Sequence, residues 1–383
     1  MPLAKITDPV LPRAGRQIAW RGLNGSASAL TLAHAARKAG GPLLVVTATA
    51  RDADRLEAAL RWFLGDRDLP VLHFRDRETL PYDVFSSHQD IVSDRLAALF
   101  ALTELERGVV VVAAPTLLER LPPKPYVATN SLVLEVGQKL DPETLRARLE
   151  AAGYSYVSQV MEHGEFAVRG ALIDLFPMGA DKPYRLDLFD DELETLRTFD
   201  PDSQLSLDRL ERVRLLPARE FPLDENGIRA FRQRYRSRFE GDPQRSQIYR
   251  DVSNGIAPGG IEYYLPLFFD ETCHLGNYLP GNAVVVSMDG VDTELQHTWE
   301  QIGHRYDQRG HDIERPLLPP DEAFVPPGVL QADFSQRASI RIADANEDDA
   351  AEYRTEPPPA LLVDTRSDES LHALLDYAAA NPA

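Results

Sequence analysis

The sequence predicts an α/β domain of the doubly wound type, interrupted by a small inserted α+β domain. Short apolar runs at 42–47, 70–74 and 108–114 alternate with helical segments, which is typical of a parallel sheet covered by helices on both faces. After the proline-rich string at 121–125, strand-like alternation replaces this pattern. An apolar run at 282–287 then restores the α/β character, so we expect one α/β domain whose chain is interrupted.

The first helices are expected at 28–39, 50–64 and 90–105, between the apolar runs. The first two are followed by Gly40 and Gly65, and glycine favours helix ends because it adopts the left-handed conformation there. The run at 108–114 is apolar throughout, as in strands that are buried on both faces of a parallel sheet.

The inserted domain is expected to be small and rich in strands. Its segments alternate apolar and polar residues with the period of two that places successive side chains on opposite faces of a strand. It closes near Pro217. In chain order we expect an apolar strand at 131–136, a helix at 142–152, and strands at 165–174, 184–189 and 194–199.

An arginine-rich helix at 224–240 follows the inserted domain. From Pro326 onward, further prolines and the acidic string at 346–349 suit a solvated linker. The expected boundaries are 1–126 for the first part of the α/β domain, 127–217 for the inserted domain, 218–325 for the part that completes the α/β domain, and 326–383 for the linker and the start of a following domain.

Composition excludes several classes of protein. The 383-residue chain has a net charge of −19, which argues against strong nonspecific nucleic-acid binding, because such binding needs Lys and Arg to neutralise phosphates. A single cysteine, Cys273, cannot form an internal disulfide or a cysteine-based zinc site. No stretch approaches the roughly 20 apolar residues of a membrane span, and the N-terminus lacks a signal-peptide core, so we expect a cytoplasmic protein without membrane contact.

A glycine-containing string at 22–29 precedes the first of these helices, where a phosphate-binding loop would lie. In the pattern GxxxxGK[ST], the lysine reaches the β- and γ-phosphates and the hydroxyl holds Mg²⁺. The string predicts a degenerate loop, and a plain strand-to-helix turn is the favoured interpretation. Its glycines are Gly22 and Gly25, while Ala27 takes the second glycine position, Ser28 the lysine position and Ala29 the hydroxyl position.

The apolar run at 282–287 ends where a nucleotide-binding domain carries an Asp ligand for Mg²⁺. Met288 occupies that position and Asp289 follows it; a carboxylate displaced by one residue along a strand points to the other face. Two motifs that each lack an essential group predict a decayed NTPase with no catalytic residue. The histidines show no metal-binding spacing, so no metal site is predicted.

The strand expected at 184–189 carries a chemically distinctive face. Alternation places Arg185, Asp187 and Phe189 on one side, and it points Arg169 of the preceding strand outward. An exposed Phe beside two Arg is typical of a protein-binding hot spot. In the alternative, Phe189 packs under the turn that follows it and the arginines pair with local acids; composition alone leaves the two about even.

Five strings in a fixed order resemble those of one family: TLPYD with SHQD at 79–90, MEHGEF at 161–166, RGALIDLFPM at 169–178, PYRLD at 183–187, and GIEY with LFF at 260–269. From about residue 15 to about residue 325, the chain closely resembles the N-terminal region of the bacterial transcription-repair coupling factors (Mfd). That resemblance implies a UvrB-like fold: a domain 1a, an inserted domain 2 and a domain 1b, with a nonfunctional copy of the P-loop NTPase nucleotide site.

The resemblance also implies a partner. In the family, domain 2 binds the repair protein UvrA, and the contact residues fall by motif on Arg169, Arg185 and Phe189. UvrB's DNA-gripping hairpin has no room between Tyr82 and Asp90. ATP, Mg²⁺, DNA and RNA polymerase belong to family domains beyond this region, so no cofactor is expected here and the chain is expected to be an N-terminal fragment.

The whole parent would be an ATP-dependent DNA translocase that displaces stalled RNA polymerase and recruits nucleotide excision repair. This chain would be its UvrA-recruiting module, not itself catalytic. Two alternatives stay open: a UvrB-like enzyme that still binds or hydrolyses nucleotide, and a purely autoinhibitory module of the parent.

Overall fold

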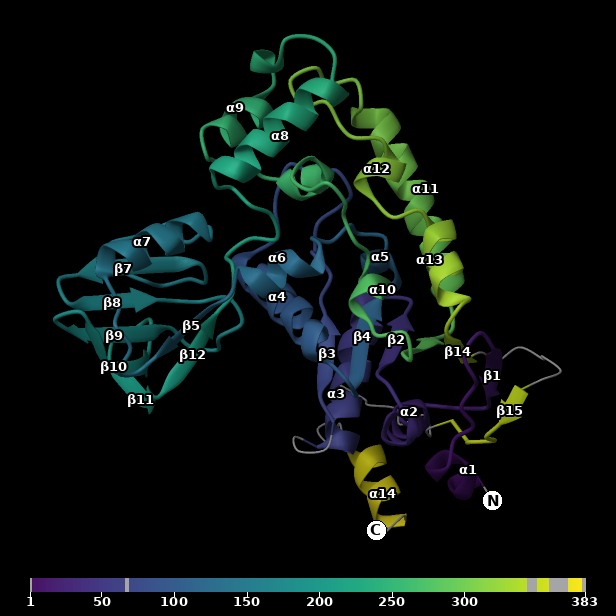
Figure 1. Ribbon diagram of the computed structural model, residues 1–383. Coiled ribbons are helices and arrows are strands. Elements are labelled where there is room, and N and C mark those ends of the chain that lie inside the picture. The colour runs from purple at the N-terminus through teal and green to yellow at the C-terminus, as the bar shows by residue number, and fades with distance from the viewer. Residues whose placement is uncertain (1, 66–68, 343–349, 358–370, 381–383) are drawn as a thin grey trace.

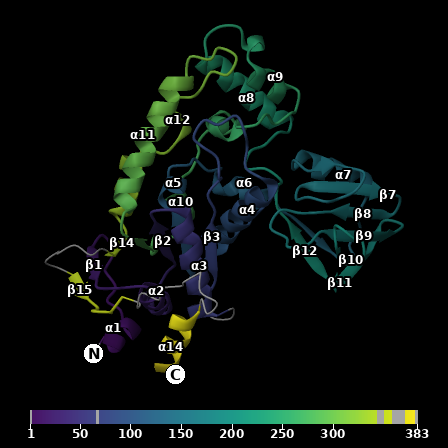
Figure 2. The same ribbon diagram turned by 180° about the vertical axis from the view of Figure 1, so that it is seen from behind.

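The computed structural model describes residues 2–65, 69–342, 350–357 and 371–380. An α/β domain, an inserted β-rich domain beside it and a group of helices above it make up the molecule (Figures 1 and 2). Among the described residues, no helix is both long and apolar enough to cross a membrane.

The α/β domain is built on a seven-stranded sheet whose recorded strand pairs are all parallel. Three of its strands lie side by side in register at the centre, where Val45 is flanked by Val111 and Val286. From edge to edge the strands are β15 (Ala350–Glu352), β1 (Gln17–Arg21), β14 (Ala338–Ile342), β13 (Val284–Ser287), β2 (Leu43–Thr47), β4 (Val109–Ala113) and β3 (Val71–Phe74).

Helices cover both faces of this sheet, because alternate residues of the apolar strands face opposite ways. One core contains Val45 and Val111 with residues of α1 (Pro2–Thr7), α2 (Ala27–Lys38) and α3 (Ala50–Leu64). The other contains Val46 and Val112 with residues of α4 (Gln89–Glu104), α5 (Ala114–Leu117), α6 (Lys124–Thr129), α10 (Leu275–Tyr278) and α11 (Val291–Arg309). The predicted doubly wound α/β architecture is confirmed.

The C-terminal part of the chain corrects one prediction. Residues from Pro326 onward do not form only a linker: α13 (Pro327–Phe334) packs on the core, and β14 and β15 flank β1 on its two sides. The prediction of a linker was based on the proline and acidic residues that border these elements. Pairing with β1 is a long-range contact, so local composition does not indicate it. The acidic string at 346–349 lies outside the described residues, and α14 (His372–Ala380) follows as an exposed helix.

The inserted domain contains a six-stranded sheet with α7 packed on one face (Figure 1). The strand predicted at 165–174 is in fact two antiparallel strands, because Gly170 (φ 63°) starts a tight turn between them. The order is β11 (Ser206–Leu210), β10 (Glu192–Phe199), β9 (Tyr184–Phe189), β8 (Leu172–Leu175), β7 (Glu165–Arg169) and β6 (Ser155–Tyr156); α7 is Pro142–Ala151, and β5 (Leu132–Glu135) pairs with β12 (Arg212–Leu215).

Most of the chain between β12 and α10 forms the helical group at the top of Figure 1. Its longest member, α8, begins at the N-cap Asp224, whose carboxylate accepts a hydrogen bond from the Gly227 N–H. The members are α8 (Glu225–Arg238), the 3₁₀ turn at Pro243–Arg245, α9 (Gln247–Ser253) and the 3₁₀ segment at Ile261–Leu267; α12 (Pro320–Ala323) packs nearby.

A buried ion-pair network joins the α/β domain to the segment that leaves the inserted domain. Arg95, on α4, binds Glu220 at 2.8 Å (Nε–Oε1) and Glu119 at 2.6 Å (Nη2–Oε2). Arg77 pairs with the same two carboxylates. Each group has a partner, so the cost of burying four charges is offset, and the exit of the inserted domain is fixed to the sheet.

Candidate docking site and closed nucleotide loop

The distinctive side chains of the inserted domain share one face of its sheet. Asp174 on β8 lies directly opposite Arg185 on β9, and β7 contributes Arg169 opposite Leu172. Directly paired residues project to the same side of a sheet. The opposite side holds the core under α7, so the sheet presents a charged face and an apolar face.

Asp174 organises this charged face from below. Its carboxylate is buried and accepts hydrogen bonds from the Arg185 Nε at 2.7 Å and Nη2 at 3.0 Å, and it also pairs with Arg169. Arg185 also donates to the Gln204 carbonyl at 3.0 Å and lies 4.6 Å above the Phe199 ring. Two charge-assisted bonds in a fork hold the Arg185 guanidinium in one orientation. Arg169 stays half exposed.

Phe189, at the end of β9, is 67% exposed. Asp190 follows it with φ 53°, in the left-handed conformation of the turn that leads into β10. A backbone bond from the Leu140 N–H to the Asp191 carbonyl (2.6 Å) ties this turn to the domain. The ring is therefore presented to solvent from a fixed hairpin.

Two interpretations of this face were open, an exposed hot spot or a packed Phe189 with locally paired arginines, and each is correct in part. The arginines do pair with a local acid, Asp174, as the alternative stated. Phe189 does not pack under the following turn, since most of its surface is open. The structure thus places Arg169 and Arg185 on one carboxylate and Phe189 on the same face, one strand alternation beyond Asp187.

The degenerate nucleotide loop lies between β1 and α2. Gly22 (φ 71°) and Gly25 (φ 55°) have the left-handed backbone that the turn requires. Ala27 is the first residue of α2, and Ser28 and Ala29 are buried in its first turn, so these three positions supply no cationic side chain for a phosphate.

The chain's own C-terminal segment closes this loop. Thr355 Oγ1 accepts a hydrogen bond from the Asn24 N–H at 2.7 Å and donates to the Gly22 carbonyl at 2.8 Å. The Asn24 side chain donates to the Thr355 carbonyl at 2.7 Å. A Cβ on Gly22 would lie 2.9 Å from the Arg354 nitrogen, so the two backbones are in close contact. Of the backbone N–H groups in the loop that could hold a phosphate, that of Asn24 is already bonded to Thr355.

The second degenerate motif lies at the end of β13. Met288 is half-buried between the two cores, and its N–H donates to the Val46 carbonyl at 2.9 Å. Asp289 is exposed, ahead of Gly290 at the start of α11. A cavity of about 280 Å³ opens at the carboxyl ends of β2, β3 and β4, and its lining contains no residue of 22–29 or 288–289.

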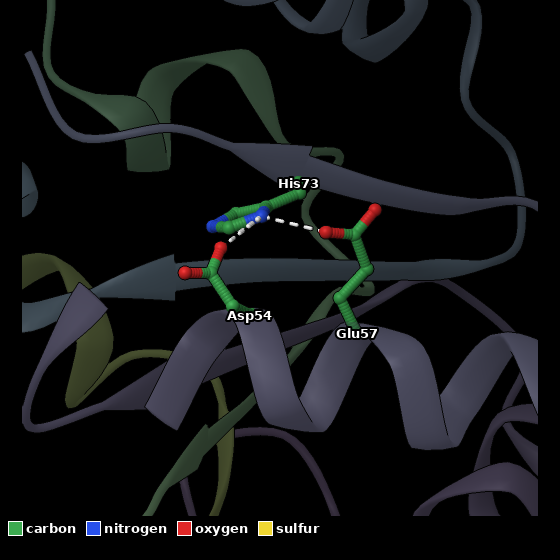
Figure 3. A group of neighbouring side chains, drawn as sticks. All are labelled: Asp54, Glu57 and His73. Atoms are coloured by element: carbon green, nitrogen blue, oxygen red, sulfur yellow. Dashed lines mark hydrogen bonds and ion pairs between the residues drawn. The ribbon is translucent and has the colours of Figure 1, made fainter. Parts of the chain in front are cut away.

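One group of side chains has a geometry that could hold a metal (Figure 3). His73 Nδ1 on β3 lies 2.7 Å from Glu57 Oε2 and 3.7 Å from Asp54 Oδ1, both on α3. Arg61 also binds Glu57, at 2.8 Å. The His73 bond, followed by Arg61, outweighs burial and lowers the pKa of Glu57 to about 2. With two partners already on this carboxylate, the group is best described as an ion-paired cluster.

The fold and the charged face define a class of protein: a P-loop-like α/β domain with an inserted domain of the UvrB type. Residues 132–221 match the family described as "UvrB interaction domain". The chain is 43% identical over 322 residues to the transcription-repair-coupling factor of Escherichia coli, covering 84% of this chain and 28% of that protein. It is 44% identical over 302 residues to the factor of Haemophilus influenzae and 32% identical over 382 residues to that of Myxococcus xanthus, covering 78% and 94% of this chain.

This chain belongs to the transcription-repair coupling factor family and corresponds to its N-terminal region. It spans 26–28% of the length of the first two of these relatives.

Two residues that matter at these sites were missed by the sequence analysis. Asp174 carries a signal, because it is the one charged residue in the apolar string of β8. Thr355 carries none, because its role depends on a contact with a loop more than 300 residues earlier in the chain.

Proposed function

We propose that this chain recruits the repair protein UvrA through the charged face of its inserted domain. Arg169, Arg185 and Phe189 are the contact residues. The observation that carries the proposal is the exposed Phe189 ring on the same sheet face as two arginines that pair with a buried carboxylate. The match of residues 132–221 to the UvrB interaction domain supports a repair-protein partner.

The chemistry of the face fits a protein partner. An aromatic ring on a fixed hairpin loses little conformational entropy when it is buried, and aromatic and arginine residues dominate interface hot spots. Arg169 remains half exposed and can pair with a partner carboxylate, whereas Arg185 is mostly occupied by Asp174. We therefore assign contact roles to Phe189 and Arg169, and both a contact and an orienting role to Arg185.

The test is UvrA binding by calorimetry with single variants of the purified chain. Phe189→Ala should weaken binding by about 2 kcal/mol, roughly thirtyfold, with an unchanged melting temperature. Phe85→Ala removes the same side chain from an equally exposed position (71%) in the α/β domain, and it should bind as the wild type. A folded Phe189→Ala variant with wild-type affinity would place the recruitment site elsewhere.

Arg185 needs a different control, because its loss also leaves the buried Asp174 short of a partner. Arg185→Ala should lower both stability and UvrA affinity, whereas Arg169→Ala should lower affinity with a smaller loss of stability. If Arg169→Ala lowers neither, Arg169 is not a contact residue.

We further propose that the longer parent protein is an ATP-dependent DNA translocase that displaces stalled RNA polymerase, with ATP and Mg²⁺ bound outside this chain. In this proposal the chain itself is not catalytic: Ser28 stands in place of the lysine, Ala29 in place of the Mg²⁺-binding hydroxyl and Met288 in place of the Mg²⁺-binding carboxylate. Thr355 also covers the loop. No observation favours a residual nucleotide enzyme.

A further inference from the structure

Helix α8 stands out electrostatically from the rest of the molecule. It carries five arginines and one acid, Glu225, in a chain whose net charge is −19. Arginines concentrated on one helix of an acidic protein form a local positive field that the overall charge does not reveal.

The side chains of α8 divide into three stripes. Phe231 and Tyr235 are buried in the core. Arg234 pairs with Asp270, and Arg238 binds Glu322 at 2.8 Å, so these two arginines serve the fold. The third stripe is Arg229, Arg232 and Arg236, spaced by three and four residues and therefore on one exposed side of the helix.

No carboxylate neutralises the third stripe among the described residues. Arg232 donates to the Tyr249 hydroxyl at 3.3 Å, and Arg236 lies 5.5 Å from the Tyr249 ring. Arg229 makes no hydrogen bond or ion pair within the described part of the chain. These arginines line a shallow hollow together with Gln233, Ser237 and Ser253 of α9, and Glu225 lies at its edge.

We propose that Arg229, Arg232 and Arg236 form a binding surface for the phosphate backbone of nucleic acid. Phosphate contacts come from Arg, Ser and Gln side chains of this kind. At 1.5 Å per residue, the three arginines extend over about 10 Å of the helix axis, which is comparable to the length of about three successive phosphates of one strand at about 3.4 Å each. An acidic protein is a poorer fit, because the aromatic residues Phe231 and Tyr235 are buried and α8 offers no exposed aromatic anchor within the described structure.

The predicted interaction is weak and strongly salt-dependent. Three neutralised phosphates on duplex DNA give a slope of about −2.7 in log affinity against log salt, or about 40-fold between about 50 and 200 mM. This agrees with the composition, which predicts no tight nonspecific binding near physiological salt. The surface is far from the UvrA face in sequence and is separate from the proposed recruitment function.

The test is fluorescence anisotropy of the 383-residue chain with a labelled DNA duplex of about 30 base pairs at about 50 mM salt. The triple variant Arg229→Ala/Arg232→Ala/Arg236→Ala should lose at least tenfold in affinity and flatten the salt slope by about 2.7, to nearly zero. Its melting temperature should fall only slightly, because the stripe is exposed and loses one hydrogen bond, from Arg232 to the Tyr249 hydroxyl. The control Arg13→Ala/Arg16→Ala/Arg51→Ala removes the same charge from exposed positions in the α/β domain and should bind as the wild type.

Three outcomes would overturn the proposal. They are no binding by the wild type at about 50 mM salt, equal losses in the triple variant and its control, and capture of polyglutamate instead of DNA by the α8 stripe. The last result would assign the stripe to an acidic protein partner.

Discussion

The nucleotide loop and the charged face of the inserted domain both contain polar groups that bond to other residues of the chain. In the loop the bonding residue lies on the outer side, whereas in the charged face it lies on the buried side. Thr355 bonds to Gly22 and Asn24 from outside the loop and so covers it. Asp174 bonds to Arg169 and Arg185 from inside the domain and leaves Phe189 open. Thr355 thus leaves less of the loop open to a ligand, whereas Asp174 orients side chains of the proposed docking face without covering it.

The largest effect is expected from a change in the buried ion-pair network, which joins the α/β domain that holds the loop to the inserted domain that holds the charged face. Glu220→Gln removes one carboxylate from the buried network and leaves Arg77 and Arg95 short of charge. We expect a loss of about 3–5 kcal/mol in the free energy of unfolding, measured by urea denaturation. The exposed Glu211→Gln is the control and should change stability little. A loss below about 1 kcal/mol for Glu220→Gln would mean that the network does not hold the regions together.

The same network predicts a pH dependence. Burial alone would raise the pKa of Glu220, but Arg77 and Arg95 outweigh it and hold the pKa at about 2, below the ordinary value of 4.5. The stabilisation that Glu220 contributes is therefore complete above pH 4.5 and is lost as the pH falls toward 2. The difference in the free energy of unfolding between the wild type and Glu220→Gln should therefore decrease by about 3 kcal/mol as the pH falls from 4.5 to 2. A constant gap would contradict the ion-pair assignment.

A smaller effect tests whether the buried Asp174 orients the arginines of the charged face for UvrA binding. Asp174→Ala removes the shared partner of two arginines, so we expect a loss of about 2–3 kcal/mol in stability and weaker UvrA binding, although Asp174 itself is buried. Asp187→Ala, on the same face, should leave stability nearly unchanged. If Asp174→Ala remains folded and binds UvrA at full strength, the orientation of the arginines is unimportant for recruitment.

Local pattern was enough to predict the elements but not their long-range partners. The helix at 50–64 and the strand at 184–189 have the predicted bounds, because caps, glycine and alternation act within a few residues. Alternation also predicted which face of β9 carries Arg185 and Phe189. The turn within 165–174 was missed, although the alternation changes phase there: Phe166 and Val168 face the core before Gly170-Ala171, and Ile173 and Leu175 face it afterwards.

The C-terminal segment illustrates the opposite case. β14 is only five residues long, and its place between β1 and β13 depends on pairing with strands at residues 17–21 and 284–287. No local signal encodes such a contact. For the same reason the sequence predicted that the nucleotide loop is chemically degenerate, from Ser28 and Ala29, but not that Thr355 closes it.

The smallest expected effect distinguishes two reasons why the loop would not bind nucleotide: the missing lysine and the closure by Thr355. Thr355→Ala removes the bonds of Oγ1 to Asn24 and Gly22, and we expect a loss of about 1 kcal/mol in stability. Thr355→Ser keeps the hydroxyl and should behave as the wild type. Calorimetry should detect no Mg-ATP binding by either variant, because position 28 has no lysine to reach the phosphates. Micromolar binding by Thr355→Ala would show that closure, and not the missing lysine, keeps the loop silent.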